Sequence, residues 1–237
     1  MKVLWFSVTP SLFHTYSNSH NGGGWIASLE RIVRQVQEVE LGIAFNFAAE
    51  GFVHEQDGVK YYPISHESLE TYKQIIDDFK PDLIQIFGSE NDFGRICDTT
   101  EVPVVIHMQG CLPPYHNALL PVGMSKTDFI LQKGLSLRYR YIGLRSESAF
   151  RKRAKRELQT IGKCRYFMGR TDWDHRLIDL FNPSATYFHC EEALRQSFID
   201  GEEVWTGNED GTKRVVSIIS RPWYKGCDLI LKTANLL

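Results

Sequence analysis

The sequence lacks the short motifs that identify the commonest metal sites and hydrolases. Its eight histidines form no H-x-x-x-H or H-E-x-x-H pattern, and no serine stands in a G-x-S-x-G elbow. Five cysteines are scattered along the chain without a C-x-x-C pair. We therefore predict that the protein holds no metal, that its cysteines are reduced, and that it works in the cytoplasm.

Long apolar runs and a large net charge are also absent. The apolar run at residues 3–8 is soon broken by Thr9 and Pro10, so it is too short for a signal sequence or a membrane span. Lys and Arg number 27 against 29 Asp and Glu, and the net charge of -2 gives no general attraction to nucleic acid. The content of 43% hydrophobic and 24% charged residues is typical of a globular protein with a sizeable core.

Short apolar runs alternate along the chain with segments of helical periodicity. The runs predict buried strands over residues 3–8, 41–48, 59–64, 82–88, 102–108, 164–168 and 186–189. The periodic segments predict helices over 25–36, 69–79 and 144–161 and from about residue 172, whereas residues 111–125 are expected to form a loop. This alternation predicts an α/β fold with a Rossmann-like, mostly parallel sheet and helices on both faces.

A stretch rich in glycine and charge, residues 199–213, is the best candidate for a linker. We therefore predict a first domain over residues 1–207 and the beginning of a second over 208–237, where a strand, a basic loop and a helix follow one another. In that loop, Arg221 and Lys225 could bind a diphosphate together with backbone N–H groups at the helix start. Such a pair is also common in solvated turns.

Three glycines precede the first predicted helix. Asn21, Gly22, Gly23 and Gly24 bring backbone N–H groups to a helix N-terminus, where they suit phosphate or sugar oxygens. Gly22, Gly24 and Ala27 match the G-x-G-x-x-A pattern, but in dinucleotide-binding folds the glycines follow the first strand almost at once, whereas here a polar insert intervenes. The segment therefore predicts an oxygen-rich ligand, with a flexible loop as the alternative.

The turns after two central strands belong to the expected cleft, because ligands of open α/β sheets bind beyond the carboxyl ends of the strands. One turn contains Gly88 and Glu90, and the next contains Gln109 and Gly110. Gln109 can hydrogen-bond a hydroxyl without changing charge near neutral pH, and His107 points to the same side of its strand. We expect Gln109, His107 and Glu90 to lie at this cleft. The alternatives are a structural histidine and a solvated glutamate.

Two further segments carry positive charge. Arg170 stands where a strand gives way to a helix, so it either faces the cleft and binds an acceptor or phosphate, or lies in a turn where Thr171 or Asp172 caps the helix. Residues 138–156 predict a cationic amphipathic helix, which could contact an anionic membrane or be an ordinary solvated surface. No recognised nucleic-acid module accompanies it, so we predict no nucleic-acid partner.

Six segments resemble, in order, family 4 retaining glycosyltransferases. "NGGGWIASLE" is similar to the glycine loop of their acceptor domain, "KPDLIQIFG" to its middle strand, and "VPVVIHMQGCLPP" to the strand that ends at the cleft. "GRTDWDHRLIDLF" and "EEALRQSF" resemble the segments before the interdomain crossing, and "VVSIISRPWYKGCDLILKTANLL" resembles the start of the nucleotide-sugar domain. The resemblance implies the N-terminal half of a GT-B fold, and hence an N-terminal fragment with little activity alone.

The resemblance also implies a reaction. A sugar would move, with retention and without a metal, from a nucleotide diphosphate sugar to a glycan or lipid-linked acceptor, as in polysaccharide biosynthesis. The nucleotide sugar is a co-substrate, so no cofactor is implied, and the enzyme would work in the cytoplasm or at the inner face of the membrane. Lys225 and Arg221 would neutralise the leaving diphosphate, while the glycine loop, Gln109 and the Gly88 turn would align the substrates.

This sequence departs from the family pattern at two places. Where the family commonly has His-Gly at the end of the cleft strand, with the histidine reaching the donor sugar, this sequence has Gln109-Gly110. The resemblance therefore implies a catalytic role for Gln109, with His107 as the second choice, and Glu90 would orient an acceptor hydroxyl. The spacing from Arg221 to Lys225 is one residue shorter than the common one. Two other functions fit the residues: a nucleotide-dependent oxidoreductase or epimerase, with Glu50 as the only candidate for the acidic ribose ligand, and a non-catalytic domain that binds a sugar or nucleotide.

Overall fold

The computed structural model describes residues 1–13, 24–47, 53–120, 122–131, 137–202, 207, 216 and 225–236. The chain forms two compact units. The first consists of Met1–Cys111 and Arg156–Gly201, and the second consists of Leu112–Lys155 and Glu202–Leu237. The predicted strand of the terminal segment lies outside the described residues.

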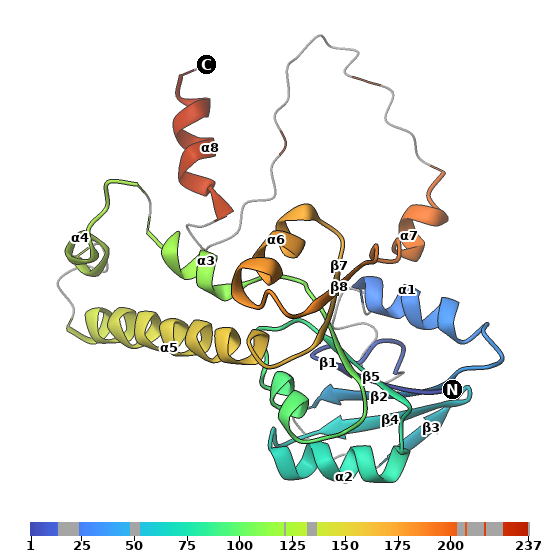
Figure 1. Ribbon diagram of the computed structural model, residues 1–237. Helices are drawn as coiled ribbons and strands as arrows, with labels where there is room; N and C mark the ends of the chain where they lie inside the picture. The colour runs from blue at the N-terminus through green and yellow to red at the C-terminus, as the bar shows by residue number, and fades with distance from the viewer. Residues whose placement is uncertain are drawn as a thin grey trace. The chain divides into compact units, whose positions relative to one another are not determined.

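The first unit contains a sheet with the strand order β3-β4-β2-β1-β5-β6-β7-β8 (Figure 1). Its strands are β1 (Lys2–Ser7), β2 (Glu40–Asn46), β3 (His54–Gln56), β4 (Val59–Ile64), β5 (Leu83–Phe87), β6 (Val104–His107), β7 (Tyr166–Gly169) and β8 (Thr186–His189). All neighbours pair in parallel except β3 and β4. With β3 set aside, the parallel strands begin with the order 3-2-1-4-5-6 of doubly wound dinucleotide-binding folds. The predicted α/β fold class is confirmed.

The helices account for most of the remaining described chain. In the first unit lie α1 (Gly24–Val33), α2 (Leu69–Phe79), the 3-10 helix η2 (Asp92–Asp98), α6 (Asp172–Phe181), α7 (Gln196–Ile199) and the end of α5 (Leu137–Ile161). The second unit holds the rest of α5, α3 (Leu112–Asn117), α4 (Lys126–Leu131) and α8 (Cys227–Ala234). None of the helices within the described ranges has both the length and the apolar character needed to cross a bilayer.

Both faces of the sheet are covered by apolar side chains. On β1, Leu4 and Phe6 belong to one cluster, and Val3 and Trp5 belong to the other. Helices α2 and η2 pack on the first cluster, whereas α1 packs on the second. A strand that is buried on both faces consists of a continuous apolar run. For this reason the sequence predicts the central strands well.

Elements that the sequence did not predict are short or polar. β3 has three polar residues and pairs with β4 through a turn at Asp57 and Gly58, both of which have positive φ. The loop predicted over residues 111–125 is wrong at its start, because residues 112–117 form α3. Pro113 and Pro114 fit into the first turn of a helix, where the backbone N–H makes no intrahelical hydrogen bond.

A buried carboxylate on α1 ties three segments together. Glu30 is fully buried, and its carboxylate accepts hydrogen bonds from the Leu12 backbone N–H (3.0 Å), from Nε of Arg34 (2.8 Å) and from the Tyr61 hydroxyl. Burial, together with the negative charge of Glu30, raises the pKa of Tyr61. A paired buried charge is costly to break. This network therefore holds the chain that leads from β1 towards the glycine-rich segment.

The prediction that all cysteines are reduced is wrong. Cys97 in η2 and Cys164 just before β7 form a disulfide, while Cys111, Cys190 and Cys227 are free thiols. The two bonded residues are 67 positions apart, so their spacing in the sequence gives no sign of the pairing. They meet because η2 and the end of α5 both pack on the same apolar cluster.

We expect the disulfide to stabilise the first unit. Closing a loop of this length lowers the entropy of the unfolded chain, so the double substitution of Cys97 and Cys164 by Ala should lower the free energy of unfolding by about 2–4 kcal/mol. Urea denaturation measures the change, and Cys190→Ser is the matched control, which should leave stability nearly unchanged. Thiol titration of the unfolded, unreduced protein should find three free thiols. Five reactive thiols would contradict the pairing.

Candidate functional site

The candidate site lies at the carboxyl ends of the central strands. β1 pairs with β2 on one side and with β5 on the other, so the winding of the chain reverses between β1 and β5. Ligands of doubly wound folds bind at this switch point, outside the carboxyl ends of the strands. The turns that follow β1, β5, β6 and β7 border that position.

The turn after β5 gathers polar side chains around a glycine. Gly88 has a φ of +88°, and a Cβ built on it would lie 2.6 Å from Oε2 of Glu90, 3.4 Å from Nδ2 of Asn91 and 3.4 Å from Oε1 of Gln109. The Gly88 N–H donates to the carbonyl oxygen of His107 (2.8 Å), which joins this turn to the end of β6. Two predicted residues from separate motifs, Glu90 and Gln109, are thus brought together.

A second buried carboxylate lies beneath this turn. Ser89 and Glu157 are each 1% exposed, and the Ser89 hydroxyl donates to the Glu157 carboxylate. The same hydroxyl lies 3.4 Å from the carbonyl oxygen of Gly110. Ser89, in the turn after β5, therefore contacts both Glu157 on α5 and the turn after β6.

Neither Ser89 nor Glu157 was among the predicted site residues. The sequence held one sign that Glu157 is buried: it shares a helix face with Ala154 and Ile161, both of which are buried. The neighbouring thiol of Cys111 also reflects this environment, because burial and the negative charges of Glu157 and Glu90 raise its pKa.

His107 lies in an aromatic environment. Its ring centre is 5.0 Å from that of Trp25 and 5.9 Å from that of Phe87, and its Nδ1 is 3.4 Å from Nε2 of Gln85. Its Nε2 is buried and has no hydrogen-bond partner within the described part of the chain. Burial, and then the positive charge of Arg170, lower the pKa of His107 to about 4. The imidazole is therefore neutral at neutral pH, and it is a weaker general base than one with a pKa near 7.

Arg170 follows β7 at the same edge of the sheet. Its side chain is 43% exposed and forms an ion pair with Glu192. The next residue confirms the capping interpretation, because Thr171 is the N-cap of α6. The Thr171 Oγ1 accepts from the Asp174 N–H (3.1 Å), and Oδ2 of Asp174 accepts from the Thr171 N–H (3.2 Å). This capping box fixes the direction in which the chain leaves β7.

The remaining predicted residues lie elsewhere or outside the described part. Gly24 begins α1 with a φ of +64°. Lys225 belongs to the second unit, where its Nζ is 5.9 Å from the ring centre of Tyr115. Four predicted ligand-binding residues lie outside the described residues: Asn21, Gly22, Gly23 and Arg221. Within the described residues, no group of three His, Cys, Asp or Glu side chains is placed to hold a metal ion.

Comparisons with known proteins add little to this site. No family model matches the sequence, and no curated protein matches it. Among solved structures, a sucrose-phosphate synthase from Thermosynechococcus elongatus matches with a TM-score of 0.49 and 6% identity, over 80% of this chain and 47% of the synthase. The chain thus spans about half the length of that protein. A similarity at this level carries no functional argument.

The crowding around Gly88 can be tested against a glycine that has a similar φ but open surroundings. Gly58 has a φ of +76° with no atom within 4 Å of a built Cβ. We expect Gly58→Ala and Gly88→Ala each to lower the free energy of unfolding by about 1–2 kcal/mol, because both residues adopt the left-handed region. Urea denaturation of the two variants measures this cost.

Only Gly88→Ala should also displace the side chain of Glu90. We expect it to shift the NMR signals of the side-chain amides of Asn91 and Gln109, whereas Gly58→Ala leaves them in place. Unchanged amide signals in Gly88→Ala would show that these side chains do not surround the turn.

The pKa of His107 predicts a loss of stability in acid. The unfolded chain binds a proton at His107 below about pH 6.5, but the folded protein binds it only below about pH 4. Stability due to neutral His107 is therefore complete above pH 6.5 and falls by about 3 kcal/mol as the pH drops to 4.

Urea midpoints of the wild type and of His107→Gln, measured across this range, isolate the contribution of His107. The difference between the two proteins should shrink as the pH falls. His189→Gln, at an exposed position, is the control and should follow the wild type. A difference between wild type and His107→Gln that does not vary with pH would refute the lowered pKa.

Proposed function

We propose that this chain is the acceptor-binding part of a retaining, metal-independent glycosyltransferase. The enzyme would transfer a sugar from a nucleotide diphosphate sugar to a glycan or lipid-linked acceptor. The observation that carries the proposal is the gathering of Glu90, Asn91 and Gln109 around Gly88 at the switch point of the sheet. A carboxylate and two amides can donate to and accept from hydroxyl groups, which are the main polar groups of a sugar.

The geometry favours this function over the oxidoreductase alternative. In a dinucleotide-binding fold, the glycine turn follows the first strand directly and opens the first helix. Here β1 ends at Ser7 and α1 begins at Gly24, so residues 8–23 separate the strand from the helix. A connection of this length differs from the tight turn that holds a pyrophosphate at the end of the first strand in those folds.

The residues would divide the work between alignment and charge. Gln109 and Glu90 would hydrogen-bond sugar hydroxyls, and the neutral imidazole of His107 would accept or donate a hydrogen bond without adding charge. In the family that the sequence resembles, the acceptor hydroxyl attacks from the face that the leaving group departs, and a diphosphate oxygen helps to accept its proton. Lys225 and Arg221 would stabilise the negative charge that develops on that diphosphate.

Ligand binding by the chain tests the proposal. We expect a nucleotide sugar or an oligosaccharide, from a panel of UDP, GDP and ADP sugars, glycans and NAD, to raise the melting temperature. Gln109→Ala should weaken binding of that ligand about threefold to tenfold, as expected for the loss of one hydrogen bond, when measured by titration calorimetry.

Gln74→Ala is the matched control, because Gln74 is an exposed glutamine on α2 and should bind the ligand as the wild type does. Stabilisation by NAD alone would replace the proposed function with the oxidoreductase. Binding of sugars that Gln109→Ala and Glu90→Ala leave unchanged would place the sugar site elsewhere.

A further inference from the structure

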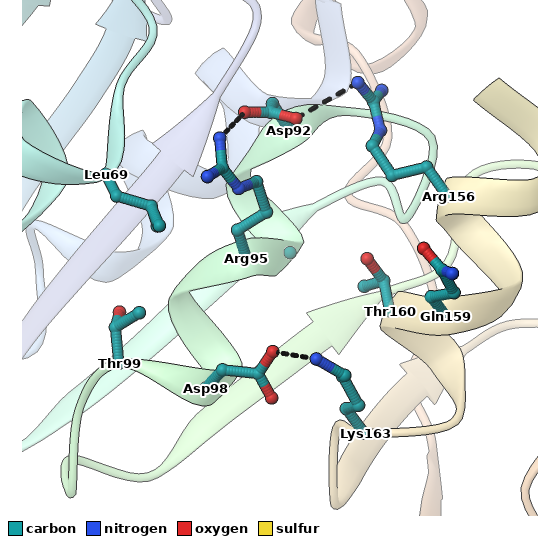
Figure 2. A pocket seen from close by; sticks show the side chains of 10 residues that line it. Leu69, Asp92, Arg95, Asp98, Thr99, Arg156, Gln159, Thr160 and Lys163 are labelled. Atoms are coloured by element: carbon teal, nitrogen blue, oxygen red, sulfur yellow. Dashed lines mark hydrogen bonds and ion pairs between the residues drawn. The ribbon is translucent and has the colours of Figure 1, made fainter. Parts of the chain in front are cut away.

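A separate pocket of about 430 Å³ lies in the first unit between η2, the start of α2 and the end of α5 (Figure 2). Its volume is within the range of about 300–1,000 Å³ that is usual for small-molecule sites. Figure 2 shows Arg95 and Arg156 on either side of Asp92, and Lys163 beside Asp98. Of these residues, only Arg156 belongs to a segment that the sequence marks as a candidate for function, the cationic helix over residues 138–156.

The pocket contains more hydrogen-bond donors than acceptors. Asp92 uses both of its oxygens, since Oδ2 accepts from Arg95 (3.0 Å) and Oδ1 pairs with Arg156 (3.0 Å). Lys163 pairs with Asp98. Arg95 donates only one N–H in these contacts, although a guanidinium has five, and Lys163 donates one of its three.

The pocket also carries a net positive charge. Three cations face two carboxylates, so the lining carries one net positive charge. Gln159, also in the lining, adds an uncharged donor and acceptor. Arg and Lys with spare N–H groups are the side chains that bind phosphate oxygens in proteins.

We infer that this pocket binds a small soluble molecule that carries a phosphate group. The phosphate would accept hydrogen bonds from the spare N–H groups of the pocket's cations, and the rest of the molecule would occupy the remaining volume. A bare phosphate ion would fill only part of the pocket, so an organic phosphate should bind more tightly than the ion. This inference does not depend on the proposed glycosyltransferase activity, because two of the pocket's three cations, Arg95 and Lys163, pair with Asp92 and Asp98 and not with the residues around Gly88.

Titration calorimetry at low ionic strength tests the pocket with two probes, inorganic phosphate and ribose 5-phosphate. We expect both to bind, with ribose 5-phosphate the tighter. Arg95→Gln and Lys163→Gln should each weaken binding about tenfold or more, because each removes charged hydrogen bonds to the phosphate. Both side chains are about half exposed, so their ion pairs contribute little to stability and the variants should fold.

Arg176→Gln is the matched control, since it removes one exposed positive charge on α6, away from the lining. It should bind both probes as the wild type does. Equal weakening in Arg176→Gln and Arg95→Gln would mean that phosphate responds only to overall charge, and would overturn the inference. Vesicles that contain phosphatidic acid form the third arm. Binding to vesicles without binding to the soluble probes would assign the cations to a membrane surface and would also overturn it.

Discussion

The buried carboxylate of Glu157 is the constraint on which the candidate site depends. A charge without solvent contact must be paired with hydrogen-bond donors, or it costs several kcal/mol. Ser89 supplies such a donor, and its hydroxyl also lies close to the Gly110 carbonyl oxygen. The turns after β5 and β6 are therefore held against α5. Because Gly88 and Gln109 are next to these anchored residues, their positions follow from the same contact.

The site above this anchor is mostly neutral. His107 is held neutral by burial, the charge of Arg170 is paired with Glu192, and the amide of Gln109 carries no charge. Hydroxyl groups are recognised well by such neutral donors and acceptors, whereas a phosphate needs positive charge. In the first unit, cationic side chains with spare N–H groups are found instead in the pocket beside η2. The two sites thus differ in the chemistry that they can bind.

The sequence predicts those elements of the fold whose side chains follow a simple pattern. The centre of a strand such as β1 is a continuous apolar run, Val3 to Phe6, because both of its faces are buried, and α2 shows its four buried apolar residues at helical spacing. Glu30 and Glu157 were missed because a glutamate on a helix usually faces solvent, and only the folded structure brings their partners to them. The disulfide was missed for the same reason, since Cys97 and Cys164 are far apart along the chain. At the site, strand-end reasoning correctly predicts that Glu90 and Gln109 share one edge.

Arg156 connects the two sites through a single guanidinium. One of its N–H groups donates to the carbonyl oxygen of Glu90 (3.1 Å), while its other end pairs with Asp92 in the phosphate pocket. A phosphate bound in that pocket would attract Arg156 and so would change the strength of its hydrogen bond to the Glu90 carbonyl oxygen. Glu90 in turn lies against Gly88, where a sugar hydroxyl would bind. Coupling between two binding sites is reciprocal, so if phosphate changes the affinity for a ligand at Gly88 through this contact, that ligand changes the affinity for phosphate by the same factor.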